Sequence, residues 1–317
     1  MAQKLRTRPQ EPIPKPRYRV TNWPEYNRAL VERGSVTLWL SDEVARGWRA
    51  CGGKGCVYSD VAIRCALSLR AVFRLTLRQA QGFLASLANQ LLPGLPVPHY
   101  STLCRRAAGL DIPAPTRGSG PVHLVVDSTG LKVFGEGEWK VRQHGVSRRR
   151  LWRKLHLGVD EATGMILTHK LTPRDVHDGP VLPKLLTQID GPLDQVSADK
   201  AYDSFGCHKA ILAKGARPVI PPRKGAAITP PPGVKDPPAT RGAIVKRIIE
   251  IGGKAWKVEA NYHRRSLAET AMPRTKTLIS SSLKARTLPN QKTEAAIAVN
   301  CLNKFTALGM PMSVKFD

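Results

Sequence analysis

The feature that most constrains the fold is a change of hydrophobic periodicity across the segment DIPAPTRGSGP, residues 111–121. Before this segment, apolar residues recur at helical spacing, and after it short apolar, β-branched runs alternate with helical segments. The segment itself has the Pro and Gly content of a linker between domains. We therefore expect a helical region followed by an α/β domain.

Residues 58–112 carry three short amphipathic segments. We expect each of the three helices to begin after a Ser or Thr N-cap, at Ser59, Thr76 and Ser101. The third helix would turn Leu103 and Ala107 inward and carry Arg105 and Arg106 beside them. Three short helices of which the last is basic fit a helix-turn-helix DNA-binding region or a plain helical bundle, and the residues alone leave both open.

Residues 1–57 form a basic arm and an N-terminal segment. The first 20 residues are rich in Pro, Lys and Arg, which predicts a flexible arm that either touches DNA or stays solvated. Ser41 is the expected N-cap of a short helix that the sequence CGGKGC then interrupts.

The charge balance points to a polyanionic partner. The chain has 50 Lys and Arg against 24 Asp and Glu, a net charge of +26 spread along its length. Nucleic acid, here double-stranded DNA, is the partner that such a surface favours. We expect no membrane association and a cytoplasmic location, because no apolar run approaches about 18 residues and the N-terminus has no apolar signal core.

The cysteines do not predict a metal site. Six are scattered along the chain, and Cys51 and Cys56 are the nearest approach to a paired motif, with no second pair following. Free thiols are therefore expected rather than a zinc site.

Residues 121–315 have the pattern of a mixed sheet with flanking helices. We expect a hairpin with its turn at Ser128–Gly130, then an apolar run at Trp152–Val159 and another at Met165–Leu167 on either side of a turn at Asp160–Gly164. These successive strands indicate a meander, and helix, strand, helix and strand follow it. The last three predicted elements are a strand that ends at Asp199, a helix at Cys207–Lys214 and a strand in RPVIPP. An insertion follows at about 218–255, in which Pro221–Gly242 contains seven prolines and predicts an irregular loop.

Two aspartates lie where strands are expected to end. Asp127 and Asp199 each follow an apolar run, and Glu269 lies on a predicted helix at Tyr262–Lys276. Three carboxylates could hold two divalent cations about 3.5–4 Å apart, an arrangement that cleaves phosphodiesters. Oxygen ligands favour Mg²⁺ or Mn²⁺ over zinc.

The predicted helix at Tyr262–Lys276 would place Tyr262, Arg265, Glu269 and Lys276 within an arc of roughly 60°. Pro273 interrupts this pattern, because it removes the hydrogen bond to the Glu269 carbonyl at a cost of roughly 3 kcal/mol. A kink there would move Lys276 off the shared face.

Other titratable residues compete for these roles: Asp160, Asp175, Asp178, Asp203, His144, His156 and His177. Asp160 lies in a DEATG turn and is expected to be a hairpin residue. Asp203 is expected to help cap the following helix and is the alternative second carboxylate. A two-metal mechanism needs no histidine base, so we expect the histidines to satisfy polar groups.

Four sequence runs, VVDSTGLKVFG, WRKLHLGVDEATG, SADKAYDS and YHRRSLAETAMPRTK, occur in this order between residues 125 and 276, downstream of the basic helical region. The similarity that they carry spans essentially residues 18–315. Together they resemble a bacterial insertion-sequence transposase of the DDE type, and the Tyr, Arg, Glu and Lys spacing is similar to that of the family-four and family-five group. The resemblance implies a ribonuclease H-like catalytic domain with Asp127, Asp199 and Glu269 as catalytic metal ligands. It also implies that Tyr262, Arg265 and Lys276 hold DNA near the scissile phosphate.

The expected function is cleavage of DNA at the terminal inverted repeats of a mobile element and joining of the 3′-OH ends to target DNA. Such an enzyme would act as a homodimer or higher oligomer in the bacterial nucleoid. Two alternatives remain open: a decayed or domesticated DNA-binding protein, and a ribonuclease H-like nuclease without strand transfer.

Overall fold

A computed structural model describes residues 17–50, 57–115, 117, 118, 120–133, 152–229 and 238–316. Its helices are α1 (Trp23–Glu32), α2 (Asp42–Arg46), α3 (Asp60–Val72), α4 (Leu77–Leu91), α5 (Tyr100–Ala107), α7 (Leu182–Leu186), α8 (Phe205–Leu212), α9 (Ala239–Ile251), α10 (Gly253–Glu259), α11 (Ser266–Arg274) and α12 (Leu288–Leu308). Short helical turns are η1 (Val36–Leu38), η2 (Gly179–Val181), η3 (Lys200–Tyr202), η4 (Tyr262–Arg265) and η5 (Thr275–Ile279). The strands are β1 (Arg17–Val20), β2 (Val122–Val133), β3 (Trp152–Asp160), β4 (Ile166–Pro173), β5 (Leu193–Ala198), β6 (Arg217–Val219), β7 (Ser282–Leu283) and β8 (Ser313–Phe316).

The central sheet is mixed. Five of its six strands follow the order β4-β3-β2-β5-β6, and β7 pairs with the far end of β2. Strands β2, β3 and β4 form an antiparallel meander, whereas β5 and β7 run parallel to β2, and β6 runs parallel to β5. The predicted meander and the strands at β5 and β6 are confirmed.

Helices cover both faces of the sheet. Alternate β2 residues Leu124 and Val126 face α7 and α8 in one apolar cluster, while Val125 and Leu131 belong to a second cluster with α12. This alternation follows from the two-residue period of a strand. Each face of the sheet therefore packs against an apolar cluster, and the polar side chains of β2 lie where this packing ends.

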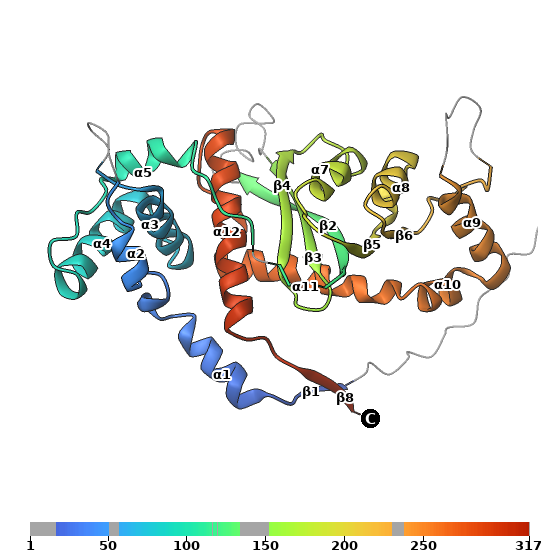
Figure 1. Ribbon diagram of the computed structural model, residues 1–317, viewed down its shortest axis with the longest axis horizontal. Helices are drawn as coiled ribbons and strands as arrows, with labels where there is room; N and C mark the ends of the chain where they lie inside the picture. The colour runs from blue at the N-terminus through green and yellow to red at the C-terminus, as the bar shows by residue number, and fades with distance from the viewer. Residues whose placement is uncertain are drawn as a thin grey trace, which may run out of the picture.

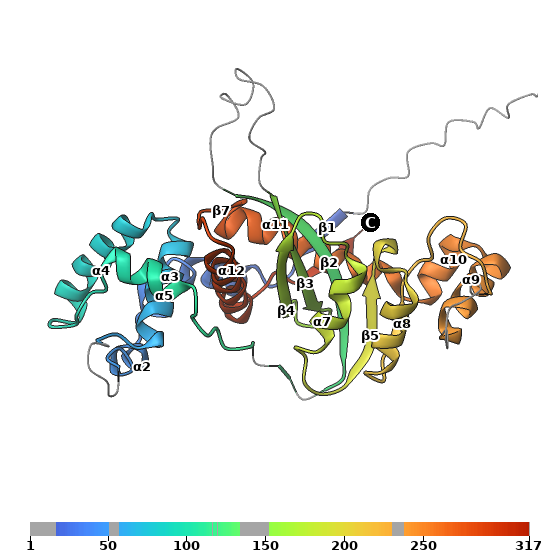
Figure 2. The same cartoon turned by 90° about the horizontal axis from the view of Figure 1, so that it is seen from above.

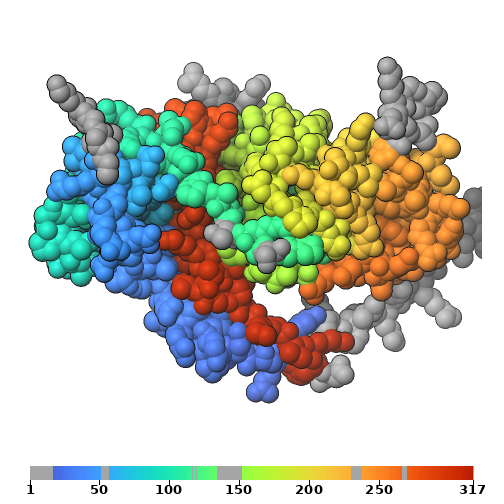
Figure 3. Space-filling model, in the orientation of Figure 1, coloured from blue at the N-terminus to red at the C-terminus, as the bar shows by residue number. Residues whose placement is uncertain are grey.

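Helix α12 connects the sheet to the N-terminal helices. It packs against α3 on one side and β4 on the other, and it lies between the two groups in both ribbon views (Figures 1 and 2). The apolar cluster around α12 runs from Trp39 to Phe305. In the space-filling view the red α12 segment separates the blue and teal helices from the green and yellow sheet (Figure 3). The predicted helix at Thr293–Leu308 is confirmed and begins earlier, at Leu288.

The N-terminal helices begin where the caps predicted, with one correction. Ser41, Ser59 and Thr76 accept the expected N-cap hydrogen bonds. The third helix is capped by His99 rather than Ser101, because the His99 ring nitrogen accepts the Ser101 N–H. The region also contains β1, which pairs with β8 and brings the two ends of the described chain together.

The hairpin predicted at Ser128–Gly130 is wrong. Strand β2 runs through these residues without a turn, because β3 pairs with each β2 residue from Leu124 to Lys132. Gly130 serves a close approach instead, since a Cβ there would lie 3.2 Å from the Trp152 ring. The small polar residues of β2 thus mark a crowded strand rather than a turn.

The proline-rich insertion is irregular only in part. Residues 221–229 lack regular structure, as predicted, and 230–237 lie outside the described residues. Helix α9 begins at Ala239, within the segment predicted to be irregular, because no proline lies between Pro238 and the end of α9 at Ile251. Among the described residues, no helix is long and apolar enough to cross a lipid bilayer. Cys65, Cys104, Cys207 and Cys301 are free thiols, as expected, whereas Cys51 and Cys56 fall outside the described part.

Candidate active site

Asp127 lies where β2 loses a neighbouring strand. The parallel partner β5 pairs with β2 as far as Val126, and β7 pairs again only from Lys132, so the intervening stretch has no strand on that side among the described residues. Helix α11 packs against β2. The half-buried Asp127 carboxylate accepts the Ser128 N–H at 2.8 Å and faces the Arg265 guanidinium at 3.2 Å.

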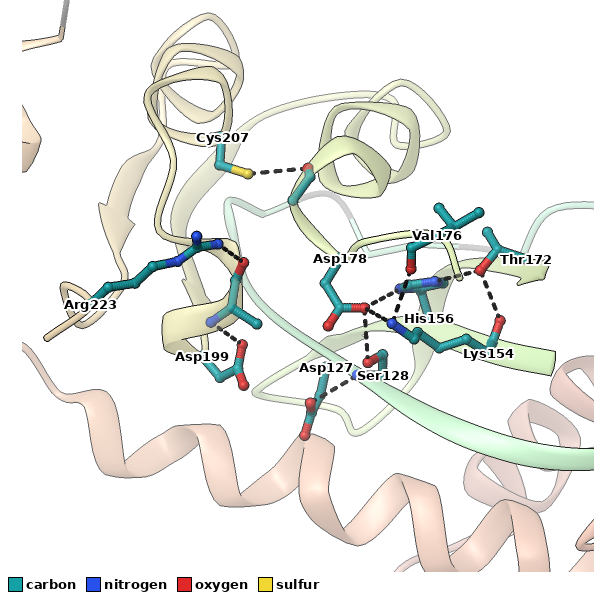
Figure 4. Close-up of polar contacts among 12 residues, drawn as sticks. Asp127, Ser128, Lys154, His156, Thr172, Val176, Asp178, Asp199, Cys207 and Arg223 are labelled. Carbon is teal, nitrogen blue, oxygen red and sulfur yellow. Dashed lines mark hydrogen bonds and ion pairs between the residues drawn. The ribbon is translucent and has the colours of Figure 1, made fainter. Parts of the chain in front are cut away.

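Asp199 directly follows β5. Its side chain caps the turn η3 by accepting the Ala201 N–H at 2.9 Å. Because Ala198 pairs with Val126, Asp199 and Asp127 occupy the next positions on two neighbouring parallel strands. Figure 4 shows both carboxylates directed toward the space above a long helical segment. Two oxygen-bearing side chains therefore meet at one edge of the sheet.

Glu269 lies in α11, the helix that packs against β2 and β3. Its side chain is outside the part of the chain that the structure describes, so the geometry of the third predicted carboxylate stays a prediction. Among the described residues, no group of three His, Cys, Asp or Glu side chains could hold a metal ion. A complete ligand set of the predicted kind would need Glu269.

The sequence predicted one α-helix at Tyr262–Lys276, but the structure has three helical geometries in this segment. It begins as the 3₁₀ turn η4, continues as α11 and ends in the π-helical turn η5. Pro273 stays inside α11, and the helix widens two residues later, at Thr275. The missing Pro273 N–H explains the change of geometry, because the ladder of i to i−4 hydrogen bonds cannot pass through it. The arc of 60° therefore does not hold for Lys276.

Arg265 lies beside Asp127, and Tyr262 lies beside Arg265. The Arg265 guanidinium is 5.7 Å from the centre of the Tyr262 ring, and the same guanidinium pairs with Asp127. Tyr262 in turn packs against Trp256 of α10. Lys276 lies elsewhere, in a pocket that Arg70 and Leu131 also line. The structure thus brings together three of the predicted side chains and separates Lys276 from them.

A second carboxylate network adjoins Asp127 and was assigned no role from the sequence. One oxygen of Asp178 lies 3.1 Å from Lys154 Nζ and 3.2 Å from Ser128 Oγ, which donates to it. His156 Nδ1 lies 3.6 Å from the same oxygen. Since the Ser128 N–H also donates to Asp127, one residue joins the two carboxylates (Figure 4). Lys154 and Asp178 are distant in sequence, and only the register of β3 against β4 brings them together.

His156 is fully buried and shares a 3.0 Å hydrogen bond with Thr172 Oγ1. Burial lowers the pKa of His156 to about 4, although Asp178 opposes that shift. The ring is thus neutral at pH 7 and satisfies polar groups, as expected. His177 is exposed, and His144 lies outside the described residues.

Tyr202 lies beneath the carboxylates. Its side chain is fully buried, and the hydroxyl makes no hydrogen bond of normal geometry within the described part of the chain. Burial raises the pKa of Tyr202, and the negative charges of Asp178, Asp127 and Asp199 raise it further. A neutral phenol therefore borders all three aspartates.

Asp203, the alternative second carboxylate, is occupied by arginines. It accepts Arg241 Nε at 2.8 Å and the Arg223 N–H at 2.9 Å, and it is buried. Burial alone would raise the pKa of Asp203, but contacts from His208 and Arg241 hold it well below its usual range. The N-cap of α8 is Ser204, so the capping role predicted for Asp203 is wrong.

The structure gives no metal-binding role to Asp160 or Asp175. Asp160 accepts the Ala162 N–H and the Thr163 hydroxyl within a turn, which confirms its prediction as a hairpin residue. Asp175 is exposed.

The two arginines of α5 differ in their surroundings. Arg105 is exposed, whereas Arg106 pairs with Asp60 and donates to the Tyr58 carbonyl. Arg106 therefore ties α5 to the start of α3, and Arg105 has the more accessible charge.

Comparison with known protein families identifies the family of this chain. Two family models, both described as a transposase DDE domain, match residues 31–136 and 118–304. The second match covers more than half of the chain, including Asp127, Asp199 and Glu269. The chain belongs to the transposase DDE domain family. It is therefore a transposase, and DNA is the partner that the family implies.

This chain is similar to one solved structure, a cryo-EM structure of the piggyBac transposase synaptic complex with hairpin DNA, with 12% sequence identity and a TM-score of 0.38. The similarity covers 87% of this chain and 75% of that chain.

DDE transposase domains generally use divalent metal ions, and the donor set of this transposase suits such ions. Asp127 and Asp199 offer hard carboxylate oxygens, and one Asp199 oxygen remains beyond the one that accepts the Ala201 N–H. The Arg265 cation beside Asp127 provides the positive charge that a metal ion would supply at this position. These carboxylate oxygens therefore suit a divalent metal ion.

Proposed function

We propose that this transposase binds the terminal inverted repeats of its own insertion sequence and cleaves there with Asp127, Asp199 and Glu269 as ligands of two divalent cations, Mg²⁺ or Mn²⁺. The observation that supports this most is the placement of Asp127 and Asp199 at adjacent positions of the parallel strands β2 and β5. Helix α11, which carries Glu269, packs against β2 beside them. The ribonuclease H-like fold and membership of the insertion-sequence family-five group belong to the same proposal.

The bound ions would activate a water molecule and stabilise the leaving oxygen. The chain's own side chains have other tasks. Asp127 and Asp199 orient the reacting centre, while Ser128 fixes Asp127 through its N–H. Arg265 pairs with Asp127 in the structure and, once a cation takes that place, its guanidinium is available for a DNA phosphate.

Cleavage breaks one P–O bond with water and leaves a 3′-OH. That hydroxyl then attacks a target phosphodiester, so one P–O bond forms as another breaks. Both steps need the same site, and bringing two element ends together needs a homodimer or a higher oligomer. We assign the enzyme to the bacterial cytoplasm, at the nucleoid.

The division of labour in the proposal follows the regions of the chain. Residues 58–112 would bind DNA through Arg105 and Arg106, after an arm at 1–57. Residues 121–315 would form the catalytic domain with an insertion at about 218–255. Tyr262 and Arg265 would contact DNA near the cleaved bond, and Lys276 would contact the same DNA farther from it.

The test is cleavage of a labelled duplex that contains the DNA flanking the gene. Purified transposase should cleave it with Mg²⁺ or Mn²⁺ and not with a chelator, and Glu269→Gln should abolish cleavage while Asp175→Asn keeps it. Unchanged cleavage by Glu269→Gln would refute the assignment.

A strand-transfer assay with supercoiled target DNA separates the remaining alternatives. Joined products are expected of a transposase. Cleavage without joining would indicate a nuclease, and specific DNA binding without cleavage would indicate a decayed copy.

A further inference from the structure

A pocket lies between the N-terminal helices and the sheet. It has a volume of about 160 Å³ and is bordered by the end of α3, η5, β7 and α12. Its charged lining residues are Arg70, Arg74, Lys276, Lys284 and Glu294. We call this space the junction pocket. Four cations and one carboxylate thus surround a small cavity that neither Asp127 nor Asp199 lines.

The single carboxylate does not neutralise the four cations. Glu294 accepts the backbone N–H groups of Lys284 and Ala285 at 3.0 and 2.8 Å. It reaches the Arg70 guanidinium only at 3.8 Å. Most of its hydrogen-bonding capacity is therefore used to fix the segment after β7.

Like charges face each other in the junction pocket. Burial lowers the pKa of Lys284, Arg70 and Arg74 lower it further, and Glu294 only partly opposes them. The Lys284 ammonium donates to the Arg74 carbonyl at 2.8 Å, which holds it beside the arginines. An anion in the pocket would relieve this repulsion.

Donors remain for an anion. Arg70 Nε is buried and has no hydrogen-bond partner, and the Lys276 ammonium has no hydrogen bond or ion pair to the described residues. Ser281 and Ser282 also line the cavity, whereas the Ser280 hydroxyl there already donates to the Ser282 carbonyl. A guanidinium, an ammonium and nearby hydroxyl groups are the donors that bind phosphate in proteins.

We propose that the junction pocket binds a phosphate group of the DNA backbone, at a position separate from the carboxylate site. This inference rests on the proposed function. Its geometry suits a DNA strand that passes Asp127, because Leu131 of the pocket lies four residues farther along β2. Four residues of a strand span about 13 Å, which is within the length of a few base pairs of one bound duplex.

The pocket would also fix the N-terminal helices relative to the sheet on bound DNA. Arg70 and Arg74 come from the α3 end, whereas Lys276 and Lys284 follow α11 and β7. One phosphate would therefore contact residues of the N-terminal helices and residues next to the sheet at the same time.

The first test uses inorganic phosphate with the full-length protein. At constant ionic strength, replacing chloride by phosphate should raise the melting temperature of the wild type and of Lys246→Gln, which changes an exposed lysine of α9. The rise should be clearly smaller in Lys276→Gln and Lys284→Gln. Equal responses in all four proteins would overturn the pocket. Lys276→Gln removes no hydrogen bond seen in the described residues, so a folding defect does not obscure the result.

The second test asks whether the phosphate comes from DNA. The logarithm of duplex affinity falls linearly with the logarithm of salt concentration, and Lys276→Gln should reduce that slope by about one, with Lys246→Gln unchanged. A lost phosphate response with a wild-type slope would overturn DNA as the source. Neither measurement involves metal or cleavage, so failure of the proposed catalysis would show separately.

Discussion

Asp178 shows how one residue can prepare a site that it does not enter. One of its two oxygens pairs with Lys154 and accepts a hydrogen bond from Ser128, whose N–H donates to Asp127. Asn carries no negative charge, so it cannot form the ion pair with Lys154. Asp178→Asn should therefore hold Ser128, and through it the Asp127 carboxylate, less firmly in place. We expect single-turnover cleavage to fall by about 10-fold and the metal concentration for half-maximal rate to rise.

The control for this prediction is Asp175→Asn, an exposed neighbour on the same loop. A purely structural role for Asp178 would lower the melting temperature without moving the metal dependence. That outcome would contradict the positioning role.

His156 predicts a defined pH dependence of stability. Its folded pKa is about 4, below the value of about 6.5 for an unfolded histidine. Between these two values the unfolded chain binds a proton that the folded chain does not, so stability falls as pH falls through this window. The contribution of His156 should reach about 3 kcal/mol near pH 4.

Urea unfolding at several pH values between 7 and 4 checks this. His156→Gln should flatten the dependence relative to wild type, and His177→Gln, which changes an exposed histidine, should not. Identical slopes in wild type and His156→Gln would refute the assignment.

Strand β3 approaches its neighbours closely at Gly158. A Cβ added at Gly158 would lie 2.5 Å from Thr168 Cγ2 of β4 and 3.2 Å from Leu124 of β2. Gly158→Ala should therefore destabilise the sheet by about 1–3 kcal/mol. Gly206→Ala in α8 is the matched control, because no atom lies within 4 Å of its Cβ position and alanine favours a helix. Denaturant unfolding measures this loss of stability. Equal stability of Gly158→Ala and wild type would contradict the prediction.

Elements were predictable from the sequence where a local pattern decides them. The Ser59 and Thr76 caps and the apolar stripe of α12 depend on neighbours in the chain. The single strand β2 was not, because pairing with β3 overrides the Ser-Thr-Gly turn signal. In the segment around Glu269, Pro273 signalled a change of geometry, but local sequence does not specify that α11 continues past the proline into a π-helical turn.

The candidate site shows the same limit. Asp127 and Asp199 could be selected because each follows an apolar run. The role of Asp178 could not, because Lys154 and Ser128 come from strands β3 and β2, distant from it in sequence. Tyr202 lies near Asp199 in sequence, but Asp127 and Asp178 come to it only through the fold. Lys276 fits the spacing of the resemblance, yet the π-helical turn places it in the junction pocket.

At the scale of the whole molecule, Asp203 connects α9 to the turn η3 beside Asp199. Its buried carboxylate binds Arg241 of α9 and the Arg223 N–H, and it directly follows η3, the turn that Asp199 caps. Arg241→Gln would leave this buried charge with fewer partners, which costs about 3–5 kcal/mol. We expect faster hydrogen exchange in both α9 and η3. Arg247→Gln, on an exposed face of α9, is the control. Unchanged exchange at η3 would show that the insertion is not coupled to the site.

The central claim is that Asp127 and Asp199 form part of one divalent metal site. Calorimetric titration of Mn²⁺ into the full-length transposase tests it without knowledge of the DNA sequence. The wild type should bind Mn²⁺ in a way that Asp127→Asn and Asp199→Asn each weaken by at least 10-fold, with Asp175→Asn unchanged. Wild-type Mn²⁺ affinity in both variants would contradict the account.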